Sequence, residues 1–413
     1  MPNLQIPLDI PDLKIISQSF DNKGNILLKV ESRKTETLCH KCGKPATKRY
    51  GHCSPMTVRH LPVLDTPVYL RIKPVRYQCE HCDDHPVTTE KYDWCDQKAG
   101  ITRSLEEYLM RSLINSTIED VSKKERIGYR VVESAVNRLI STRVDWSQYT
   151  DLHTLGIDEI SNRKGYQDFI AIISARDSRG RLSILAVLND RKRETVLDFF
   201  ESIPGDLKKT VKNVCTDMHD GFVYPAMEVF GKQAVVVDRY HVARLYRKPL
   251  DKLRIKEMAR LKNEISEADY AKLENMMWIL RKHHECLTET DKNKLELLYQ
   301  YSPELKEAHH YALRFTGIFN AHSDRKSAIS KIERWIESVE KSTLSCFNSF
   351  IKTITKYKGS IANYFKARKN SGFVEGLNNK IKVIRRRCYG LIKTSSLFQR
   401  LVLDLRGYKM AKF

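Results

Sequence analysis

The sequence predicts a multidomain protein of the α+β class, and three observations support that class. The chain has 413 residues, which is more than a single compact domain usually holds. Hydrophobic residues make up 41% of it, enough for packed cores and too many for a wholly disordered chain. Strand-like and helix-like patterns alternate in blocks, which predict domains at residues 1–100, 101–148, 149–243, 244–360 and 361–413.

Two Cys-x-x-Cys pairs in residues 1–100 predict a structural zinc site. Two such pairs on tight turns can complete a tetrahedral shell and stabilise a small module with little core. The predicted zinc ligands are Cys39, Cys42, Cys79 and Cys82. The spacer between the pairs is longer than in most zinc ribbons, so other ligands stay open: His40, His81, His85, Cys53 and Cys95.

The block 101–148 predicts a helix-turn-helix. A first helix begins at Ser116 or Thr117, a turn falls near Ile127 and Gly128, and a second helix covers residues 129–140. If the second helix enters the major groove of DNA, it would present an exposed polar face. That face consists of Arg130, Glu133, Ser134, Asn137 and Arg138. A plain helical connector remains the alternative, because short helices around a glycine turn are common.

The block 149–243 predicts the element order βββαβαβ. The expected strands cover residues 152–158, 168–175, 181–188, 211–217 and 233–238. A meander followed by alternating helices and strands implies a mixed sheet whose later strands are parallel. Ribonuclease-H-like folds have this order. The first strand ends at Asp158 and the fourth at Asp217, so both carboxylates should lie near one edge of the sheet.

Carboxylates gathered at one sheet edge suit two-metal phosphoryl transfer, in which they hold two divalent cations around a water-filled site. A strand-end aspartate is, however, more often a turn or helix-cap residue. Three other carboxylates therefore compete for the role: Glu159, Asp220 and Asp238, the last of which is followed by His241.

The block 244–360 predicts an all-α insertion. Its charged helical pattern includes Trp278 and Trp335, for which burial in an apolar helix core is a better explanation than stacking on DNA.

The block 361–413 predicts a basic helix that carries a single glutamate. Glu375, Asn379, Lys382 and Arg386 recur at helical spacing, so they share one face. Glu375 could supply a third metal-binding carboxylate, with the cations on the same helix lying near phosphates. It could equally be a first-turn residue that the helix dipole favours.

The charge balance favours an anionic partner. Lys and Arg total 72 against 51 Asp and Glu, a net charge of +21. Such a surplus favours nucleic acid or an anionic membrane. No apolar run approaches the roughly 18 residues that a membrane-spanning helix needs, and no secretory signal pattern is visible. The membrane interpretation is therefore set aside, and a cytoplasmic nucleic-acid-binding protein is expected.

The order of these motifs resembles bacterial insertion-sequence transposases of the DDE type, in particular the ISL-three group. The segments that carry the resemblance are "LGIDEIS", "CTDMHDGF", "VVVDRYHV" and "GFVEGLNNKIKVIRRRCYG". The resemblance extends over nearly the whole chain. It implies a ribonuclease-H-like core interrupted by an all-α insertion. Its acidic triad would fall on Asp158, Asp217 and Glu375 and hold Mg²⁺ or Mn²⁺, and Asp238, His241 and Asn379 would be accessory residues.

The resemblance further implies DNA cleavage and strand transfer, carried out on the nucleoid by a homodimer or higher oligomer. The partners would be double-stranded DNA, both the terminal inverted repeats of the element and the target. The expected DNA-binding residues are Arg130, Asn137, Arg138, Lys382, Arg385, Arg386 and Arg387. Two alternatives remain open: a DNA-binding regulator built on an inactive core, and a structure-specific nuclease that joins nothing.

Overall fold

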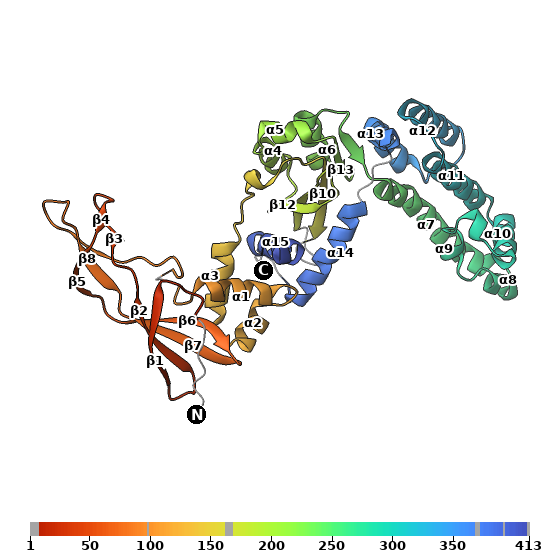
Figure 1. Ribbon diagram of the computed structural model, residues 1–413. Coiled ribbons are helices and arrows are strands. Elements are labelled where there is room, and N and C mark those ends of the chain that lie inside the picture. The colour runs from red at the N-terminus through yellow and green to blue at the C-terminus, as the bar shows by residue number, and fades with distance from the viewer. Residues whose placement is uncertain (1–7, 97–98, 162–167, 368–371, 391–392, 411–413) are drawn as a thin grey trace. The chain divides into compact units, whose positions relative to one another are not determined.

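The computed structural model describes residues 8–96, 99–161, 168–367, 372–390 and 393–410 (Figure 1). The chain divides into two compact units. The first consists of Met1–Thr142, Arg387–Tyr389 and Gln399–Phe413, and the second of Arg143–Arg386 and Gly390–Phe398. Both helices and sheets are present, so the predicted α+β multidomain class is confirmed. Among the described residues, no helix has the length and apolar character needed to cross a membrane.

Small sheets make up the N-terminal part of the first unit. A four-stranded sheet has the order β1-β2-β7-β6, with β1 Leu13–Phe20, β2 Ile26–Ser32, β6 Met56–Val63 and β7 Thr66–Ile72. A three-stranded sheet pairs β5 Lys48–His52, β8 Val75–Gln78 and β9 Val87–Thr89, and a two-stranded one pairs β3 Thr37–Leu38 with β4 Pro45–Ala46. Alternate residues of β2 point into the core, as the period of a strand requires.

Three helices follow these sheets: α1 Arg103–Leu113, α2 Ile118–Lys124 and α3 Tyr129–Leu139. Thr102 and Thr117 cap α1 and α2 by accepting hydrogen bonds from backbone N–H groups of the first turn. The later part of α15 (Thr394–Met410) belongs to the same unit, where Arg400 donates a 3.0 Å hydrogen bond to the carbonyl of Leu113. Leu403 shares the hydrophobic core of the three helices.

The second unit contains a five-stranded sheet of order β12-β11-β10-β13-β14. Its strands are β10 Thr154–Ser161, β11 Phe169–Arg176, β12 Leu182–Leu188, β13 Asn213–Thr216 and β14 Val235–Val237. The strands β10, β11 and β12 pair antiparallel, whereas β10, β13 and β14 pair parallel. The helices that connect the later strands are α4 Arg193–Glu201, α5 Gly205–Thr210 and α6 Asp220–Phe230. The strands thus follow the predicted order, with the short α5 added. The predicted end of the first strand at Asp158 is wrong, because β10 continues to Ser161 through its pairing with β11.

A block of helices follows β14 and begins with α7 (Figure 1). Its helices are α7 Arg239–Glu264, α8 Glu267–Lys272, α9 Met276–Ile279, α10 Glu289–Tyr301, α11 Pro303–Asn320, α12 Arg325–Glu340 and α13 Asn348–Ala367; the short 3₁₀ helices of this unit cover Trp146–Gln148 and His284–Cys286. Trp335 is 2% exposed and packs edge-on against Phe315 and Phe350, so it is a core residue as predicted. Trp278, in contrast, is 60% exposed, so its expected burial is wrong. Helix α14, Gly372–Arg387, follows this block.

Candidate active site and cysteine cluster

Three aspartates lie side by side at the carboxyl edge of the parallel strands. Asp158 and Asp217 each stand two residues beyond the paired residues Gly156 of β10 and Cys215 of β13. Asp238 directly follows β14, and its backbone N–H donates a 3.1 Å hydrogen bond to the carbonyl of Thr216. We call Asp158, Asp217 and Asp238 the acidic cluster. Asp238 also caps α7, since its carboxylate accepts from the N–H of Tyr240.

The electrostatics of the cluster favour a bound cation. Burial raises the pKa of Asp158. Burial also raises the pKa of Asp217, to about 6; His241 opposes this shift, whereas the negative charges of Asp158 and Glu159 add to it. His241, in the first turn of α7, lies close enough to both aspartates to oppose part of the rise that burial causes. Carboxylates that repel one another in a buried site gain stability when a cation lies between them.

Helix α14 contacts this cluster through an amide that the sequence did not single out. Asn378 donates a hydrogen bond from Nδ2 to Oδ2 of Asp158. The Oδ1 atom of Asn378 is buried and has no hydrogen-bond partner within the described part of the chain, and the same holds for Oγ1 of Thr216. An amide oxygen such as that of Asn378, beside the carboxylate of Asp158, fits a hard divalent cation such as Mg²⁺ or Mn²⁺.

Two residues of α14 that the sequence predicted for the site, Glu375 and Asn379, lie close to this contact in the chain. Glu375 is in α14, three residues before Asn378, but its side chain lies outside the part of the chain that the structure describes. Asn379 is exposed, whereas its neighbour Asn378 is the one that reaches Asp158.

The other competing carboxylates have partners of their own. Glu159 forms an ion pair with Arg191. Asp220 accepts hydrogen bonds from Lys356 at 2.6 Å and from Tyr357, both on α13. Burial raises the pKa of Asp220, but these two hydrogen bonds outweigh it and lower the pKa below its usual value. Asp220 therefore binds α13 and is not needed to explain the acidic cluster.

A basic groove adjoins the acidic cluster. Its lining consists of Glu159, Ile160, Ser161, Asn378, Lys382, Arg385 and Arg386. Arg385 donates a 2.6 Å hydrogen bond to the carbonyl of Ser161, which fixes α14 against the end of β10. Lys382 and Arg386 are exposed and are placed for anionic groups. Arg387 instead forms an ion pair with the buried Asp404, so this predicted DNA-binding residue is bound within its own unit.

The predicted DNA-binding residues of α3 also differ from one another. Arg130 is exposed at the start of the helix. Arg138 donates through Nε, at 2.7 Å, to the buried carboxylate of Glu106, which holds α3 against α1. Asn137 accepts a 3.1 Å hydrogen bond from Gln399 of α15. All three residues are exposed, and Asn137 and Arg138 in addition bind neighbouring helices of the unit.

The two Cys-x-x-Cys pairs come together in the first unit. The Sγ atoms of Cys39, Cys42, Cys79 and Cys82 all lie within 4.8 Å of one another. The first pair occupies the turn between β3 and β4, and the second the turn between β8 and β9. In each pair a backbone N–H two residues on donates to the first sulfur at 3.4 Å, from Lys41 and from His81. The N–H of Cys42 makes a further hydrogen bond that lowers the pKa of Cys39 to about 6. Four sulfurs in this arrangement could hold zinc as a closed structural site.

The alternative zinc ligands have other contacts. His40 Nδ1 lies 2.9 Å from Oγ1 of Thr88, and Cys53 Sγ lies 3.3 Å from Oγ1 of Thr89. His85 Nδ1 lies 3.0 Å from the carbonyl oxygen of Cys79. Neither Cys95 nor His81 belongs to the group of four sulfurs among the described residues. Among the zinc ligands that the sequence left open, the structure therefore favours the four cysteines.

Comparison with known proteins gives consistent results. A family model described as a transposase, of the ISL-three DDE type, matches residues 155–401. The chain is 25% identical over 355 residues to the transposase for insertion sequence element IS1001 of Bordetella parapertussis, covering 86% of this chain and 85% of that protein. It is 21% identical over 425 residues to the transposase for IS1557 of Mycobacterium tuberculosis (strain H37Rv), covering 97% and 93%. A solved Drosophila P element transposase strand transfer complex gives a TM-score of 0.41 at 10% identity, covering 75% of this chain and 92% of that one.

These matches identify the class of protein as an insertion-sequence transposase. Because the family model covers more than half of the chain, the chain belongs to the ISL-three family of DDE transposases. Membership of this family implies a divalent metal at the active site and an activity that cleaves and joins DNA.

Proposed function

We propose that this transposase cleaves and joins DNA with two divalent metal ions held by Asp158, Asp217 and Glu375. One observation carries the proposal. Two half-buried aspartates, Asp158 and Asp217, each lie two residues beyond the last paired residues of neighbouring parallel strands, and the helix that contains Glu375 is hydrogen-bonded to Asp158 through Asn378. The strand order and the mixed pairing of the sheet support a ribonuclease-H-like core.

Each residue of the site has a distinct task. The bound ions, Mg²⁺ or Mn²⁺, would activate a water or a 3′-hydroxyl as the nucleophile and stabilise the departing oxygen. Asp158 and Asp217 hold the ions from the rigid sheet edge, and Asn378 keeps the carboxylate of Asp158 in one orientation. Lys382 and Arg386 in the basic groove neutralise phosphates and so position the DNA. His241 acts electrostatically on both aspartates, and Asp238 caps α7, the helix that carries His241.

The first unit would recognise the terminal inverted repeats. Helices α2 and α3 have the lengths and the glycine-containing turn of a helix-turn-helix, with Arg130 exposed at the start of the second helix. The cysteine cluster would hold the adjoining strands in place around a structural Zn²⁺. Two transposon ends must be processed together, so a dimer or larger assembly on nucleoid DNA is expected.

The test is an incubation of the full chain with Mg²⁺, DNA bearing the ends of the element, and a target plasmid. A transposase yields nicked or excised ends and products joined to the plasmid. Cut ends without joined products would indicate a structure-specific nuclease. Binding without cutting would indicate a DNA-binding regulator, and either result would overturn the proposal.

Replacing Asn378 with Ala should slow strand cleavage by about 10- to 100-fold, the usual cost of losing a group that orients a metal ligand. The reason is that Asp158 loses the hydrogen bond that holds its carboxylate. Asn379→Ala is the matched control: it removes an amide side chain from the next residue, which is exposed, and should change the cleavage rate by less than about twofold. Initial cleavage rates over a range of Mg²⁺ concentrations measure both effects. Equal rates for the two variants would exclude a role for Asn378.

A further inference from the structure

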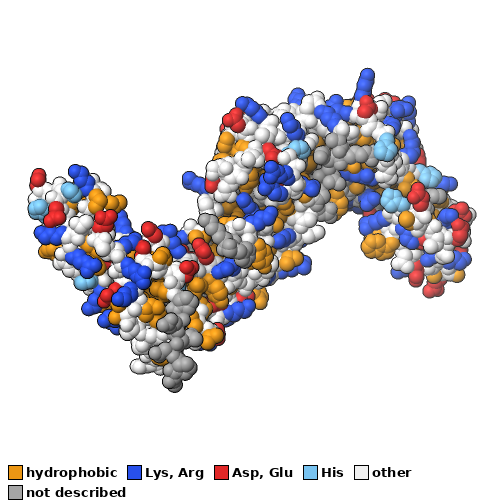
Figure 2. All heavy atoms as spheres, in the orientation of Figure 1, with side chains coloured by type: hydrophobic (Ala, Val, Ile, Leu, Met, Phe, Trp, Pro, Cys, Tyr) orange, Lys and Arg blue, Asp and Glu red, His pale blue; other side chains and the backbone are white. Residues whose placement is uncertain are grey.

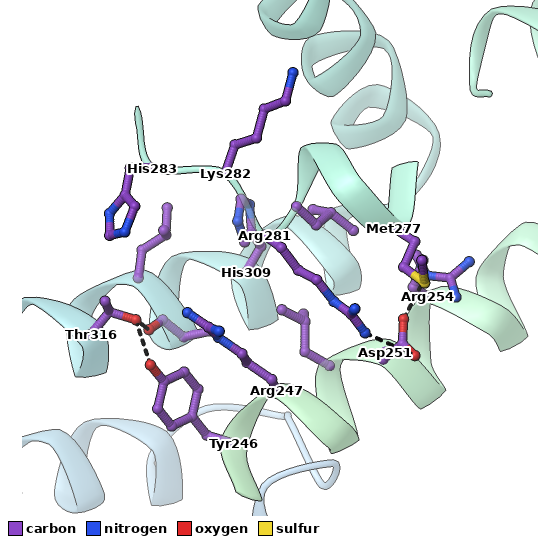
Figure 3. Close-up of a pocket in the computed structure, with 14 residues that line it drawn as sticks. Tyr246, Arg247, Asp251, Arg254, Met277, Arg281, Lys282, His283, His309 and Thr316 are labelled. Carbon is purple, nitrogen blue, oxygen red and sulfur yellow. Dashed lines mark hydrogen bonds and ion pairs between the residues drawn. The ribbon is translucent and has the colours of Figure 1, made fainter. Parts of the chain in front are cut away.

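A second basic groove lies on helix α7 and shares no lining residue with the groove on α14. Its lining consists of Tyr240, Ala243, Arg244, Arg247, Lys248, Asp251 and Arg281, and we call it the α7 groove. It is continuous with a neighbouring cavity between α7, α9 and α11, because Arg247, Asp251 and Arg281 line both. Figure 3 shows that cavity, with Arg247 beside Tyr246 and with the guanidinium of Arg281 directed at Asp251. All of these residues belong to the second unit.

The charge of the α7 groove is strongly positive. Four cations line it against a single carboxylate, that of Asp251. Asp251 already has two partners: Oδ1 accepts from Arg254 at 2.9 Å, and Oδ2 lies 3.6 Å from Arg281. Within the described residues, no ion pair involves Arg244, Arg247 or Lys248, and all three are exposed. Exposed cations without local counter-charges attract a polyanion.

The cations form a row that begins at the active site. Tyr240, Arg244 and Lys248 recur every four residues, and Arg247 lies three residues after Arg244, so the four lie on one side of α7. The N–H of Tyr240 donates to Asp238 of the acidic cluster, which fixes one end of the row. At about 1.5 Å per residue, the row then extends about 12 Å along the helix to Lys248. Figure 2 shows that lysine and arginine side chains are also spread over the visible surface, so charge alone does not distinguish this row.

Two exposed aromatic rings flank the row and distinguish it. Tyr240 is 55% exposed at the end near the active site, and Trp278 of α9 is 60% exposed beyond Arg281. The guanidinium of Arg281 lies 5.8 Å from the centroid of the Trp278 ring, and it also forms an ion pair with Asp251 at 3.6 Å. Cations arranged along a groove between exposed aromatic rings are typical of surfaces that bind a nucleic-acid strand by its phosphates and stack its bases.

We propose that the α7 groove binds the DNA strand that leaves the active site, with Arg244, Arg247 and Lys248 on its phosphates and Trp278 stacked on a base. This inference rests on the proposed function, because it requires DNA at the acidic cluster. It adds that the all-α insertion is a DNA-binding surface, beyond the basic groove on α14.

The test compares two double variants of the full chain. Arg247→Ala/Lys248→Ala removes two cations from the groove, and Lys252→Ala/Lys256→Ala removes two exposed cations of α7 that do not line it. Dissociation constants for end-bearing DNA, with a single-stranded flank, are measured over a series of salt concentrations. The slope of log Kd against log salt should fall in magnitude by about 2 for the groove variant, since each lost phosphate contact removes about 1. The control should keep the slope of the wild type.

A second measurement does not depend on variants. Ultraviolet cross-linking from bromodeoxyuridine placed in the flank should label peptides of wild-type protein that contain residues 239–254 or 273–283. Equal slopes for the two variants, or cross-links confined to other peptides, would overturn the inference while cleavage by the wild type upholds the proposed function. Wild-type protein that neither binds nor cuts the DNA would overturn both.

Discussion

Asp217→Asn is expected to lower the rate of DNA-strand cleavage by at least about 10³-fold, equivalent to about 4 kcal/mol of transition-state stabilisation. The substitution keeps the size of the side chain but removes the negative charge that would hold a divalent cation. Asp217 is suited to that role because it is half-buried, directly follows β13, and lies close enough to Asp158 for the charge of Asp158 to raise its pKa. Cleavage of end-bearing DNA in Mg²⁺ measures the rate, and a mobility-shift assay should show DNA binding within about twofold of the wild type.

Asp220→Asn is the matched control for this prediction. Asp220 lies three residues further along the chain, and its carboxylate binds Lys356 and Tyr357 of α13. Its neutralisation should weaken that contact and lower the thermal stability slightly, with cleavage near the wild-type rate. Asp158→Asn and Glu375→Gln should match the loss at Asp217. Normal cleavage by any of these three variants would remove that residue from the metal site.

The two aspartates could be predicted from the sequence because their positions depend on local patterns. The hydrophobic runs of β10 and β13 end near Asp158 and Asp217, and parallel strands bring such ends to one edge of a sheet. Asn378 could not be predicted in the same way. Asn378 and Asn379 both lie at helical spacing from Glu375, and the packing of α14 on the sheet decides which of them reaches Asp158.

Intrachain partners far apart in the sequence explain the other differences. The sequence predicted Arg138 and Arg387 as DNA-binding residues. In the structure, Arg138 forms an ion pair with Glu106 on another helix, and Arg387 forms one with Asp404 on α15. Local periodicity identifies a polar face but does not reveal what packs against it. The zinc ligands were left open for a related reason. The long segment between the two cysteine pairs forms β4 to β8, and the pairing of β5 with β8 brings the second pair back to the first.

Cys79→Ala is expected to abolish zinc binding, reducing the content from about one ion per chain to none. It is also expected to unfold the small sheets around the cluster. The hydrophobic core there is very small: the buried members are Cys39, Ala46, Val75, Tyr77 and Cys79. A core of this size does not hold a module together without a metal or disulfide, so loss of the ion removes the main cross-link. Metal analysis of the purified chain and limited proteolysis of the first 96 residues measure the two effects.

Cys53→Ser provides the control, since Cys53 lies in the same module but contacts Thr89 and not the cluster. It should retain zinc and resist protease like the wild type. Because the proposed helix-turn-helix follows this module in the first unit, loss of zinc should also weaken binding to the terminal inverted repeats. The acidic cluster lies in the other unit, so nicking of non-specific DNA should persist in Cys79→Ala. Full zinc content in Cys79→Ala would show that the four sulfurs are not the ligands. Zinc loss with normal end binding would separate the metal from DNA recognition.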